Sequence, residues 1–415
     1  MHPPRAAAAG RTASPATARL INDRLALQLL QSEGPLTAGQ LKTLTGLSRP
    51  TVADLVERLQ QAGLIAVVGE SGAQRRGPNA RLYGIVADRA HLVGLDLRTH
   101  SVTVAVADLL GRVRAEHTAP VGADATPDAA VATALAVVDQ ALAAAGADRP
   151  HTLAVGAPGL VDPATGRLGG TDRLPSWHAT LVGELRTRTA APVLLENEVN
   201  LAALAEQREG AARDHDTFVL LWLGHGTGAA VVLDGALRRG ASGGTGEIGF
   251  LPVPGTGALP SATGCDGGFH SLAGSAALCA LAAEHGLTAP PGEGAARPGP
   301  TDAPPAEALV RAAVTAAEAG ADAAATAFLD ALAARVALGA AAVCAVLDPG
   351  CVVLGGEIGL AGGAALADRV ADRLARLSPL RTGVRAGAVG GRAVLRGAVL
   401  AARDAAQDEL FTPAG

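Results

Sequence analysis

The pattern of apolar residues changes at about residue 90, and this change limits the possible folds more than any other feature. Before it, apolar residues follow helical spacing in three segments and strand-like alternation in two. After it, strand-like apolar runs and helical segments are mixed along the remaining chain. A length of 415 residues allows two to three folding units. We therefore expect a small N-terminal domain followed by a larger α/β body.

Three helices are predicted before the change. Residues 17–32 place their leucine and isoleucine side chains on roughly one helical face. Thr37 with Gln40 three residues later has the pattern of a capping box, which begins a second helix over about 38–45. Ser48 is the expected N-cap of a third helix. Two helices joined by a short turn indicate a helix-turn-helix.

Two strand-like segments, 64–70 and 80–86, follow the third helix and predict a hairpin with a polar tip. The whole segment is thus predicted to be a winged helix-turn-helix. In such a domain the third helix enters the major groove of DNA and the wing contacts phosphates or the minor groove. The side chains expected to contact DNA are Ser48, Arg49 and Thr51 on the helix, with Asp54 as a further candidate, and Arg75, Arg76 and Arg81 on the wing.

The charge of the chain is unevenly distributed. Up to residue 90 there are eleven Arg or Lys residues and six Asp or Glu residues, whereas the whole chain has a net charge of −5. A basic head on an acidic body favours a polyanionic partner, here double-stranded DNA. The alternative is a small helical protein-interaction domain, but the order of elements together with the basic tip favours DNA.

The body is predicted to contain strands mixed with helices. Residues 91–113 predict two antiparallel strands with a turn near Leu110-Gly111, and residues 129–146 predict a helix. Strands that lead into helices or glycine-rich turns are expected within 152–162, 192–200 and 217–240, two Ala-rich helices within 309–347, and a last helix within 390–406.

Five stretches of the body carry the motifs of a known family in order. They are VGAPGLVD at 155–162, LPSW at 174–177, PVLLENEVNLAALAE at 192–206, LGHGTGAAVVLDGALRRGASGGTGEIGF at 223–250 and LDPGCVVLGGEI at 347–358. With them the chain resembles the ROK family of repressors, open reading frames and kinases. The resemblance implies a two-lobed, actin-like ATPase fold of the sugar-kinase type. A winged helix before such a body is the layout of the family's repressors.

The first phosphate loop departs from the family pattern. Kinases of the family carry Asp-x-Gly-Gly-Thr, whose glycines let backbone amides approach nucleotide phosphates. Here the matching segment is Asp96-Leu97-Arg98-Thr99-His100, although the second loop keeps its glycines at Gly224, Gly226 and Gly228. We therefore expect no nucleotide cofactor and no kinase activity.

The family's catalytic base is the Asp of Glu-Asn-Asp-Ala-Asn, and its position is occupied here by Glu198. One extra methylene displaces the carboxylate, and misplacement of about 1 Å can cost about 10²-fold in rate. Glu198 can still accept hydrogen bonds from sugar hydroxyls. The plainer interpretation of Asn197 and Glu198 is that they cap a helix starting near Val199, and the two roles are compatible.

The family's zinc motif is also altered. By the resemblance, its three cysteine positions hold Ser261, Thr263 and Gly268, and its sugar-binding Glu is replaced by His270. Cys265 is a lone thiol, so we expect no metal. The expected ligand-binding residues are Asn197, Glu198, Glu247 and His270. Arg173 precedes the LPSW stretch, and it leaves an acidic effector open.

The predicted boundaries are a disordered tail at 1–16, a winged helix-turn-helix domain at 17–88, lobe 1 at 89–210, lobe 2 at 211–390 and a C-terminal helix with tail at 391–415 that returns to lobe 1. A Pro- and Gly-rich flexible insertion is expected at about 289–308. The longest uncharged apolar run is too short to span a membrane, and the N-terminus lacks a secretory signal, so we expect a cytoplasmic protein.

The combined expectation is a transcriptional regulator, a repressor of sugar-metabolism genes, whose degenerate kinase-like body senses a sugar or sugar derivative. Winged-helix regulators bind two-fold DNA sites, so we expect a homodimer or a dimer of dimers on operator DNA. Two alternatives stay open. One is a regulator that has lost sugar sensing, and the other is an active sugar kinase with a DNA-binding domain.

Overall fold

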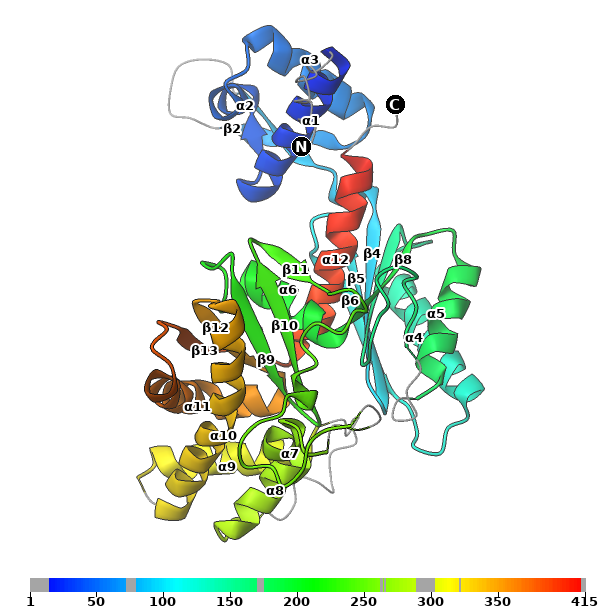
Figure 1. Ribbon diagram of the computed structural model, residues 1–415. Coiled ribbons are helices and arrows are strands. Elements are labelled where there is room, and N and C mark those ends of the chain that lie inside the picture. The colour runs from blue at the N-terminus through cyan, green and yellow to red at the C-terminus, as the bar shows by residue number, and fades with distance from the viewer. Residues whose placement is uncertain are drawn as a thin grey trace, which may run out of the picture. The chain divides into compact units, whose positions relative to one another are not determined.

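The computed structural model describes residues 15–71, 80–169, 175–261, 264, 266–288, 303–320 and 322–411. The chain divides into two compact units (Figure 1). The first consists of Met1–Leu92, Asp108–Arg112 and Arg403–Gly415, and the second of Val93–Ala107 and Val113–Ala402.

The first unit is a winged helix-turn-helix, as its sequence predicts. Its helices and strands are α1 (Pro15–Ser32), β1 (Leu36–Thr37), α2 (Ala38–Thr45), α3 (Arg49–Gln61), β2 (Ile65–Ser71) and β3 (Ala80–Ile85), with the short η1 (Ala87–Arg89). The strands form one sheet in the order β1-β3-β2, and both pairings are antiparallel. The core of the unit consists of aliphatic side chains from all three helices and both hairpin strands: Leu27, Leu30, Leu41, Val52, Leu55, Leu59, Ile65 and Ile85.

The predicted helix caps of this unit are present. The Gln40 backbone N–H donates to Thr37 Oγ1 at 3.2 Å, and the Thr37 N–H donates to Gln40 Oε1 at 2.9 Å, which completes the capping box. Gly46 ends α2 with φ 71°, a conformation that glycine adopts without strain. Ser48 caps α3, because its Oγ accepts the Thr51 N–H at 3.3 Å.

Two features of the first unit differ from the expected boundaries. Helix α1 begins at Pro15, so the last two residues of the expected tail, Pro15 and Ala16, belong to a helix. The unit also includes the end of α12 (Ala393–Leu410), where the Gln407 side chain donates to the Leu109 carbonyl at 2.9 Å. The wing tip, 72–79, lies outside the described residues.

The second unit contains two five-stranded sheets. The sheet of lobe 1 has the order β6-β5-β4-β7-β8, and the sheet of lobe 2 has the order β11-β10-β9-β12-β13. Lobe 1 and lobe 2 each consist of one of these sheets and the helices that pack against it. Figure 1 shows the two sheets as separate layers, each with its own helices. This arrangement is the α/β body that the sequence predicts.

Lobe 1 is built on β4 (His91–Leu97), β5 (Ser101–Asp108), β6 (Val113–Pro120), β7 (Thr152–Ala157) and β8 (Val193–Asn197). Helices α4 (Pro127–Ala144) and α5 (Trp177–Arg188) pack on one face and share a core with Val93, Leu95 and Val155. The intervening Gly94 and Gly156 face the other side, where their Cα atoms lie against Val399 and Val394 of α12. Helix α6 (Glu198–Glu209) packs on that side too.

The expectation of two strands over 91–113 is wrong, because the segment contains β4, β5 and the start of β6. The chain reverses at 98–100, where the Arg98 N–H donates to the Ser101 carbonyl at 2.9 Å. It reverses again at the expected turn near Leu110-Gly111, where Asp108 Oδ1 accepts the N–H groups of Leu110 and Arg112, each at 3.0 Å. The first reversal was missed because no glycine or proline marks it.

Lobe 2 is built on β9 (Phe218–Leu223), β10 (Thr227–Leu233), β11 (Ala236–Arg238), β12 (Cys351–Gly355) and β13 (Gly383–Ala386). Its helices are α7 (His270–Ala273), α8 (Ser275–Glu284), α9 (Pro305–Glu318), α10 (Ala323–Leu347) and α11 (Gly356–Leu377), with short turns η2 (Ile248–Phe250) and η3 (Gly390–Arg392). The two Ala-rich helices are therefore confirmed as α9 and α10. Helix α9 includes the last residues of the expected insertion, and 289–302 lie outside the described residues.

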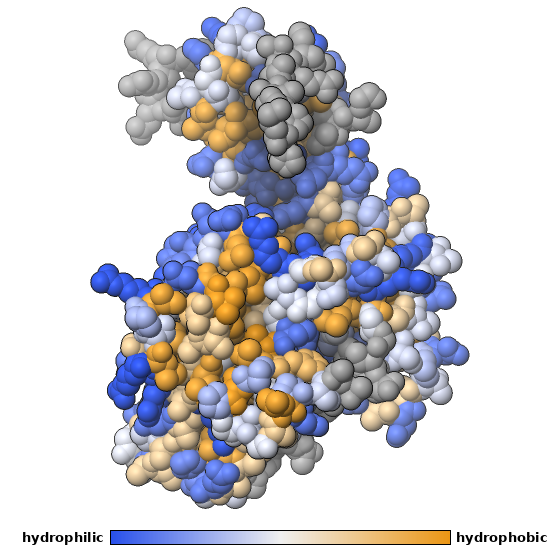
Figure 2. Space-filling view, in the orientation of Figure 1, coloured by the Kyte–Doolittle hydropathy of each residue, from blue (hydrophilic) through white to orange (hydrophobic). Residues whose placement is uncertain are grey.

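Helices α4 and α10 are long and apolar enough to cross a membrane by length and composition alone. Both are core helices of the second unit. Helix α10 buries Phe328, Leu329, Leu332 and Val336, and α4 buries Val131 and Val137 against the lobe 1 sheet. Packing inside the protein accounts for their composition. On the face shown in Figure 2, apolar side chains gather over the lobe 2 strands, with polar surface around them.

Candidate functional site

The N-terminal turn of α3 presents polar side chains on the surface of the first unit. Ser48 and Arg49 are exposed and Thr51 is half-buried, while Val52, Leu55, Val56 and Leu59 of the same helix are buried. The hydroxyls of Ser48 and Thr51 lie 2.8 Å apart. Within the described part of the chain, no ion pair is recorded for Arg49. Its guanidinium is therefore available for an external partner.

Asp54 of α3 belongs to an internal network. Arg58 forms an ion pair with Asp54 one turn away and a second with the buried Asp23 of α1, at 2.6 Å. The hydrogen bonds that Arg58 donates to Asp23 raise the pKa of Arg58. The Arg58–Asp23 contact fixes α3 against α1, and Asp54, whose side chain is 57% exposed, stays a predicted DNA contact.

The wing residues are only partly described. Arg81 is exposed on β3 and stands opposite Glu70 of β2 in the strand register. Arg75 and Arg76 lie outside the described residues. The structure thus places Arg81 on the hairpin that leads to the wing tip.

In the second unit, Asn197 caps α6 at the end of β8. Its Oδ1 accepts the N–H groups of Val199 at 2.8 Å and Asn200 at 3.3 Å, and its Nδ2 donates to the Gly159 carbonyl at 2.9 Å. The capping interpretation is therefore confirmed for Asn197. The same hydrogen bonds connect the loop after β7 to the start of α6.

Glu196 was not among the expected site residues, yet it connects the two lobes. Its Oε1 accepts the Asn197 N–H at 3.0 Å and the Asn200 side chain at 2.9 Å, and its Oε2 pairs with Arg239 at 2.6 Å. Arg239 follows β11 in lobe 2. The acidic stretch around Glu196 indicates a candidate site in this region, but no residue near it in the sequence identifies Arg239 as its partner.

Arg98, in the altered phosphate loop, lies among three carboxylates. It forms ion pairs with Asp96 at 2.9 Å, with Glu357 at 2.8 Å and with Glu198 at 3.9 Å. Burial lowers the pKa of Arg98, but the charges of Asp96, Glu198 and Glu357 outweigh it, so that the pKa lies above its ordinary value. Arg98 is thus a firmly charged residue whose partners come from both lobes.

Lobe 2 supplies the other side of this ion pair. Glu357 begins α11 just after β12, and its carboxylate lies against Gly224 of the second glycine-rich loop. A Cβ atom at Gly224 would be 2.8 Å from Glu357 Oε2 and 2.8 Å from Trp222 Nε1. Gly224, a glycine of the phosphate-loop-like segment, therefore leaves room for the side chains of Glu357 and Trp222.

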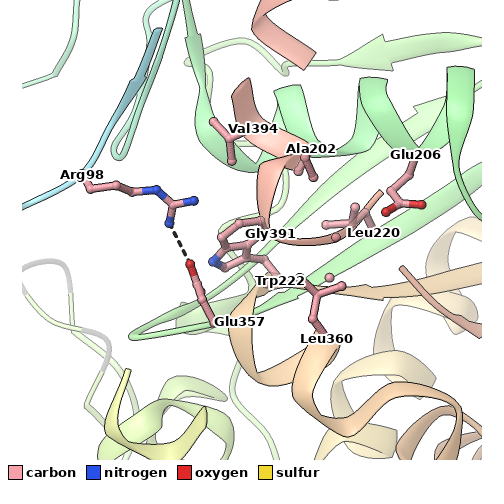
Figure 3. A pocket seen from close by; sticks show the side chains of 13 residues that line it. Arg98, Ala202, Glu206, Leu220, Trp222, Glu357, Leu360, Gly391 and Val394 are labelled. Carbon is pink, nitrogen blue, oxygen red and sulfur yellow. Dashed lines mark hydrogen bonds and ion pairs between the residues drawn. The ribbon is translucent and has the colours of Figure 1, made fainter. Parts of the chain in front are cut away.

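The space between these loops is small. Figure 3 shows Arg98 reaching toward Glu357, with the Trp222 ring close by. The guanidinium carbon lies 5.7 Å from the centre of the Trp222 ring. The cavity that they line has a volume of about 20 Å³, enough for a water molecule, whereas ligand pockets occupy about 300–1,000 Å³.

Glu247 and His270 lie on the lobe 2 side of the same region. Partial burial of its carboxyl raises the pKa of Glu247, although the residue as a whole is exposed. A Cβ atom at Gly244 would be 3.9 Å from Glu247 Cγ and 3.9 Å from a methyl group of Leu160. Leu160 follows Gly159, whose carbonyl accepts a hydrogen bond from the Asn197 side chain. His270 lies near Gly226, since a Cβ atom there would be 3.7 Å from its Nδ1.

The region of the family's zinc motif is partly described. Ser261 pairs with Gly264 and Gly268 pairs with Pro252 in isolated bridges. Thr263, Cys265 and Arg173 lie outside the described residues. Within the part of the chain that is described, no three His, Cys, Asp or Glu side chains are grouped as metal ligands would be.

Family models match both parts of the chain. The model of the ROK family matches residues 92–405, and that of the MarR family matches residues 22–77. The first match covers most of the chain. The chain belongs to the ROK family.

Among curated ROK relatives, the chain is similar to the DNA-binding transcriptional dual regulator NagC of Escherichia coli K12, with 26% identity over 237 residues. It is also similar to the xylose repressor of Bacillus subtilis, with 24% identity over 239 residues. The matches cover 56% of this chain and 57% and 60% of those relatives. A shorter stretch of 109 residues is 38% identical to the glucokinase of Thermotoga maritima and covers 26% of this chain and 34% of that enzyme.

Solved structures of the family share the fold. A ROK family transcriptional regulator, described as a homologue of the E. coli MLC protein, matches with a TM-score of 0.73 and 23% identity over 95% of this chain and 98% of that chain. At this identity the likeness shows the fold alone. A ROK glucokinase from Streptomyces griseus, in complex with glucose and AMPPNP, matches with a TM-score of 0.60 and 26% identity over 76% of this chain and 99% of that chain.

Proposed function

We propose that the protein is a DNA-binding transcriptional repressor whose ROK body senses a sugar or sugar derivative. The observation that carries this proposal is Arg49, which is exposed at the start of α3 and has no ion pair among the described residues, in a winged helix that precedes a ROK body. NagC and the xylose repressor are named as regulators, which supports it. A homodimer or dimer of dimers in the cytoplasm, bound to two-fold operator DNA, completes the proposal.

In the proposed complex, the first turn of α3 lies in the major groove of double-stranded DNA. Ser48, Arg49 and Thr51 contact base edges, and arginine bound to guanine is the most common specific contact. Arg75, Arg76 and Arg81 contact phosphates or the minor groove through the wing. These two groups predict different responses to mutation, since only base contacts carry sequence information.

The sugar site of the proposal consists of Asn197, Glu198, Glu247 and His270. Glu198 is half-buried at the start of α6, and its carboxylate can accept hydrogen bonds from sugar hydroxyls. Glu247 and Leu160 lie on either side of Gly244, and Leu160 follows the Gly159 carbonyl to which Asn197 donates. A ligand bound there contacts both lobes, so it can favour one lobe arrangement and change DNA binding.

The proposed body is not an enzyme. The Arg98–Glu357 ion pair occupies the space between the two phosphate-loop positions, and the cavity beside it has a volume of about 20 Å³. Opening that space would require breaking a half-buried pair. This argument supports a sensing role without ATP.

Binding of the full-length chain to its own upstream DNA tests the proposal. We expect tighter binding to that fragment than to a shuffled sequence, and weaker binding as salt rises. Arg49→Ala should reduce the preference for the natural sequence. Equal affinity for both sequences at moderate salt would refute the DNA-binding part.

A coupled assay tests the enzymatic alternative. The protein is incubated with ATP, Mg²⁺ and glucose, xylose or N-acetylglucosamine, and ADP release is followed. We expect no release above a no-protein blank. Sugar-dependent release that is abolished by Glu198→Ala would identify a kinase.

A separate thermal-shift experiment with the same sugars tests sensing. A ligand at 100 times its Kd adds about 2.7 kcal/mol to the free energy of unfolding, so a bound sugar raises the melting temperature.

A further inference from the structure

Several neighbours hold the guanidinium of Arg98 in place. Its Nε donates to Asp96 Oδ1 at 2.9 Å, and the Trp222 ring lies 5.7 Å from its carbon. The backbone is also held, because His178 Nε2 is 3.0 Å from the Arg98 carbonyl. The Asp96 and His178 contacts therefore fix the Nε side and the backbone of Arg98 to lobe 1, and the Nη1 end is the part that can change its partner.

Nη1 lies between two carboxylates from different lobes. It is 2.8 Å from Glu357 Oε1 in lobe 2 and 3.9 Å from Glu198 Oε2 in lobe 1. The first distance is that of a charge-assisted hydrogen bond, and the second is an electrostatic contact without one. Both carboxylates are largely shielded, with side-chain exposures of 22% and 17%. Their competing attraction for this one charged group is therefore weakly screened.

We propose that Arg98 transmits occupation of the Glu198 site to lobe 2, because Glu198 and Glu357 attract the same Nη1 group, which lies within hydrogen-bond distance of only one of them. This proposal rests on the proposed sugar-sensing function. A sugar hydroxyl that donates to Glu198 satisfies that carboxylate and reduces its attraction for Arg98. Arg98 then remains with Glu357, and the link between the lobes is strengthened. Arg98 acts as a positioning residue that does not itself contact the sugar.

The fold explains why this arrangement is possible here. Arg98 and Glu198 lie at neighbouring ends of lobe 1 elements, after β4 and at the start of α6. Glu357 approaches from the start of α11 and fits because Gly224 has no side chain. By linkage, an interaction that sugar strengthens must itself strengthen sugar binding. Loss of Glu357 should therefore weaken binding of a sugar that Glu357 does not touch.

The first experiment needs no sugar. It is a double-mutant cycle with Glu198→Gln and Glu357→Gln, in which urea unfolding is followed by tryptophan fluorescence. Both tryptophans, Trp177 and Trp222, belong to the second unit, so the signal reports that unit. If the carboxylates compete for the position of the Nη1 group, Glu198→Gln should change the unfolding equilibrium more in the Glu357→Gln background, by at least about threefold.

A matched control uses the exposed Glu318, which lies on α9 away from this pair. Glu318→Gln should combine additively with Glu357→Gln. Additive effects of Glu198→Gln and Glu357→Gln would overturn the proposal, since independent contacts do not compete. Arg98→Lys should also remove the coupling, because one ammonium cannot keep the Asp96 contact while reaching both other carboxylates.

The second experiment uses sugar with Trp177→Phe, which leaves Trp222 as the reporter beside Arg98. Glucose, xylose and N-acetylglucosamine are titrated, and emission and Kd are measured. We expect a binding sugar to change Trp222 emission, and Glu357→Gln to abolish that change and raise Kd at least about threefold. An unchanged Kd with an unchanged emission response would contradict the proposal. If no sugar binds, the sensing function fails, while the double-mutant cycle still decides whether Arg98 is shared.

Discussion

Single buried charges in the second unit have partners that explain their presence. Glu206 is 2% exposed, and its carboxylate accepts the backbone N–H groups of Ala211 at 2.7 Å, Ala388 at 2.9 Å and Val389 at 2.9 Å. Glu206→Ala leaves these donors without an acceptor, so we expect a loss of about 2–4 kcal/mol in the free energy of unfolding. Urea unfolding followed by tryptophan fluorescence measures it. Glu318→Ala on the surface should change the value by less than about 0.5 kcal/mol.

Glu247 predicts a pH dependence. Burial raises its pKa in the folded protein above the unfolded value of about 4.3. The contribution to stability is therefore present below pH of about 4.3 and is lost as pH rises through the folded pKa. Glu247→Gln should gain stability relative to the natural protein between pH 4 and pH 7, by a small amount because Glu247 is exposed. An equal difference at both pH values, measured by urea unfolding, would show that the carboxyl is not desolvated.

At the scale of elements, α3 depends on its N-cap. Ser48→Ala removes the acceptor of the Thr51 N–H and should cost about 1 kcal/mol locally. Amide hydrogen exchange in the first turn of α3 should become about fivefold faster. Ser48→Asn keeps a capping oxygen and should exchange at the natural rate. Equal exchange in all three proteins would mean that the cap contributes nothing measurable.

The contact of α12 with the lobe 1 sheet depends on Gly94. A Cβ atom there would lie 2.8 Å from Val399 Cγ2 and 2.9 Å from the Val399 backbone nitrogen. Gly94→Ala should therefore destabilise the second unit by about 1–3 kcal/mol in urea unfolding. Gly183 in α5 has nothing within 4 Å of the same position. Gly183→Ala should be neutral or stabilising by up to about 1 kcal/mol, and equal losses at both sites would contradict the packing argument.

Elements with local signals were predictable from the sequence. The capping box at Thr37, the cap at Ser48 and the cap at Asn197 each depend on residues two or three positions apart. The reversal after β4 was not predictable, because Arg98, Thr99 and His100 are not turn residues by type. Their turn follows from the long-range contacts of Arg98, and these outweigh local preference.

At the scale of the whole molecule, the sequence predicts two folding units and an α/β body, and the family match confirms the ROK fold. The pairs that connect the lobes were not predictable. Arg98 and Glu357 are 259 residues apart, and Glu196 and Arg239 are 43 residues apart. No periodicity or spacing signals such pairs. The sequence shows that the first phosphate loop is altered, and the structure shows that the Arg98–Glu357 ion pair lies there.

The central claim is that α3 reads DNA, and fluorescence anisotropy of the full-length protein tests it directly. The labelled DNA is the fragment upstream of the protein's own gene, compared with a shuffled fragment at two salt concentrations. We predict a clear preference for the natural fragment, and Arg49→Ala should reduce that preference by about 1–3 kcal/mol. Arg81→Ala should instead weaken binding to both fragments alike. If the natural protein binds both fragments equally, or if Arg49→Ala leaves the preference unchanged, the account is wrong.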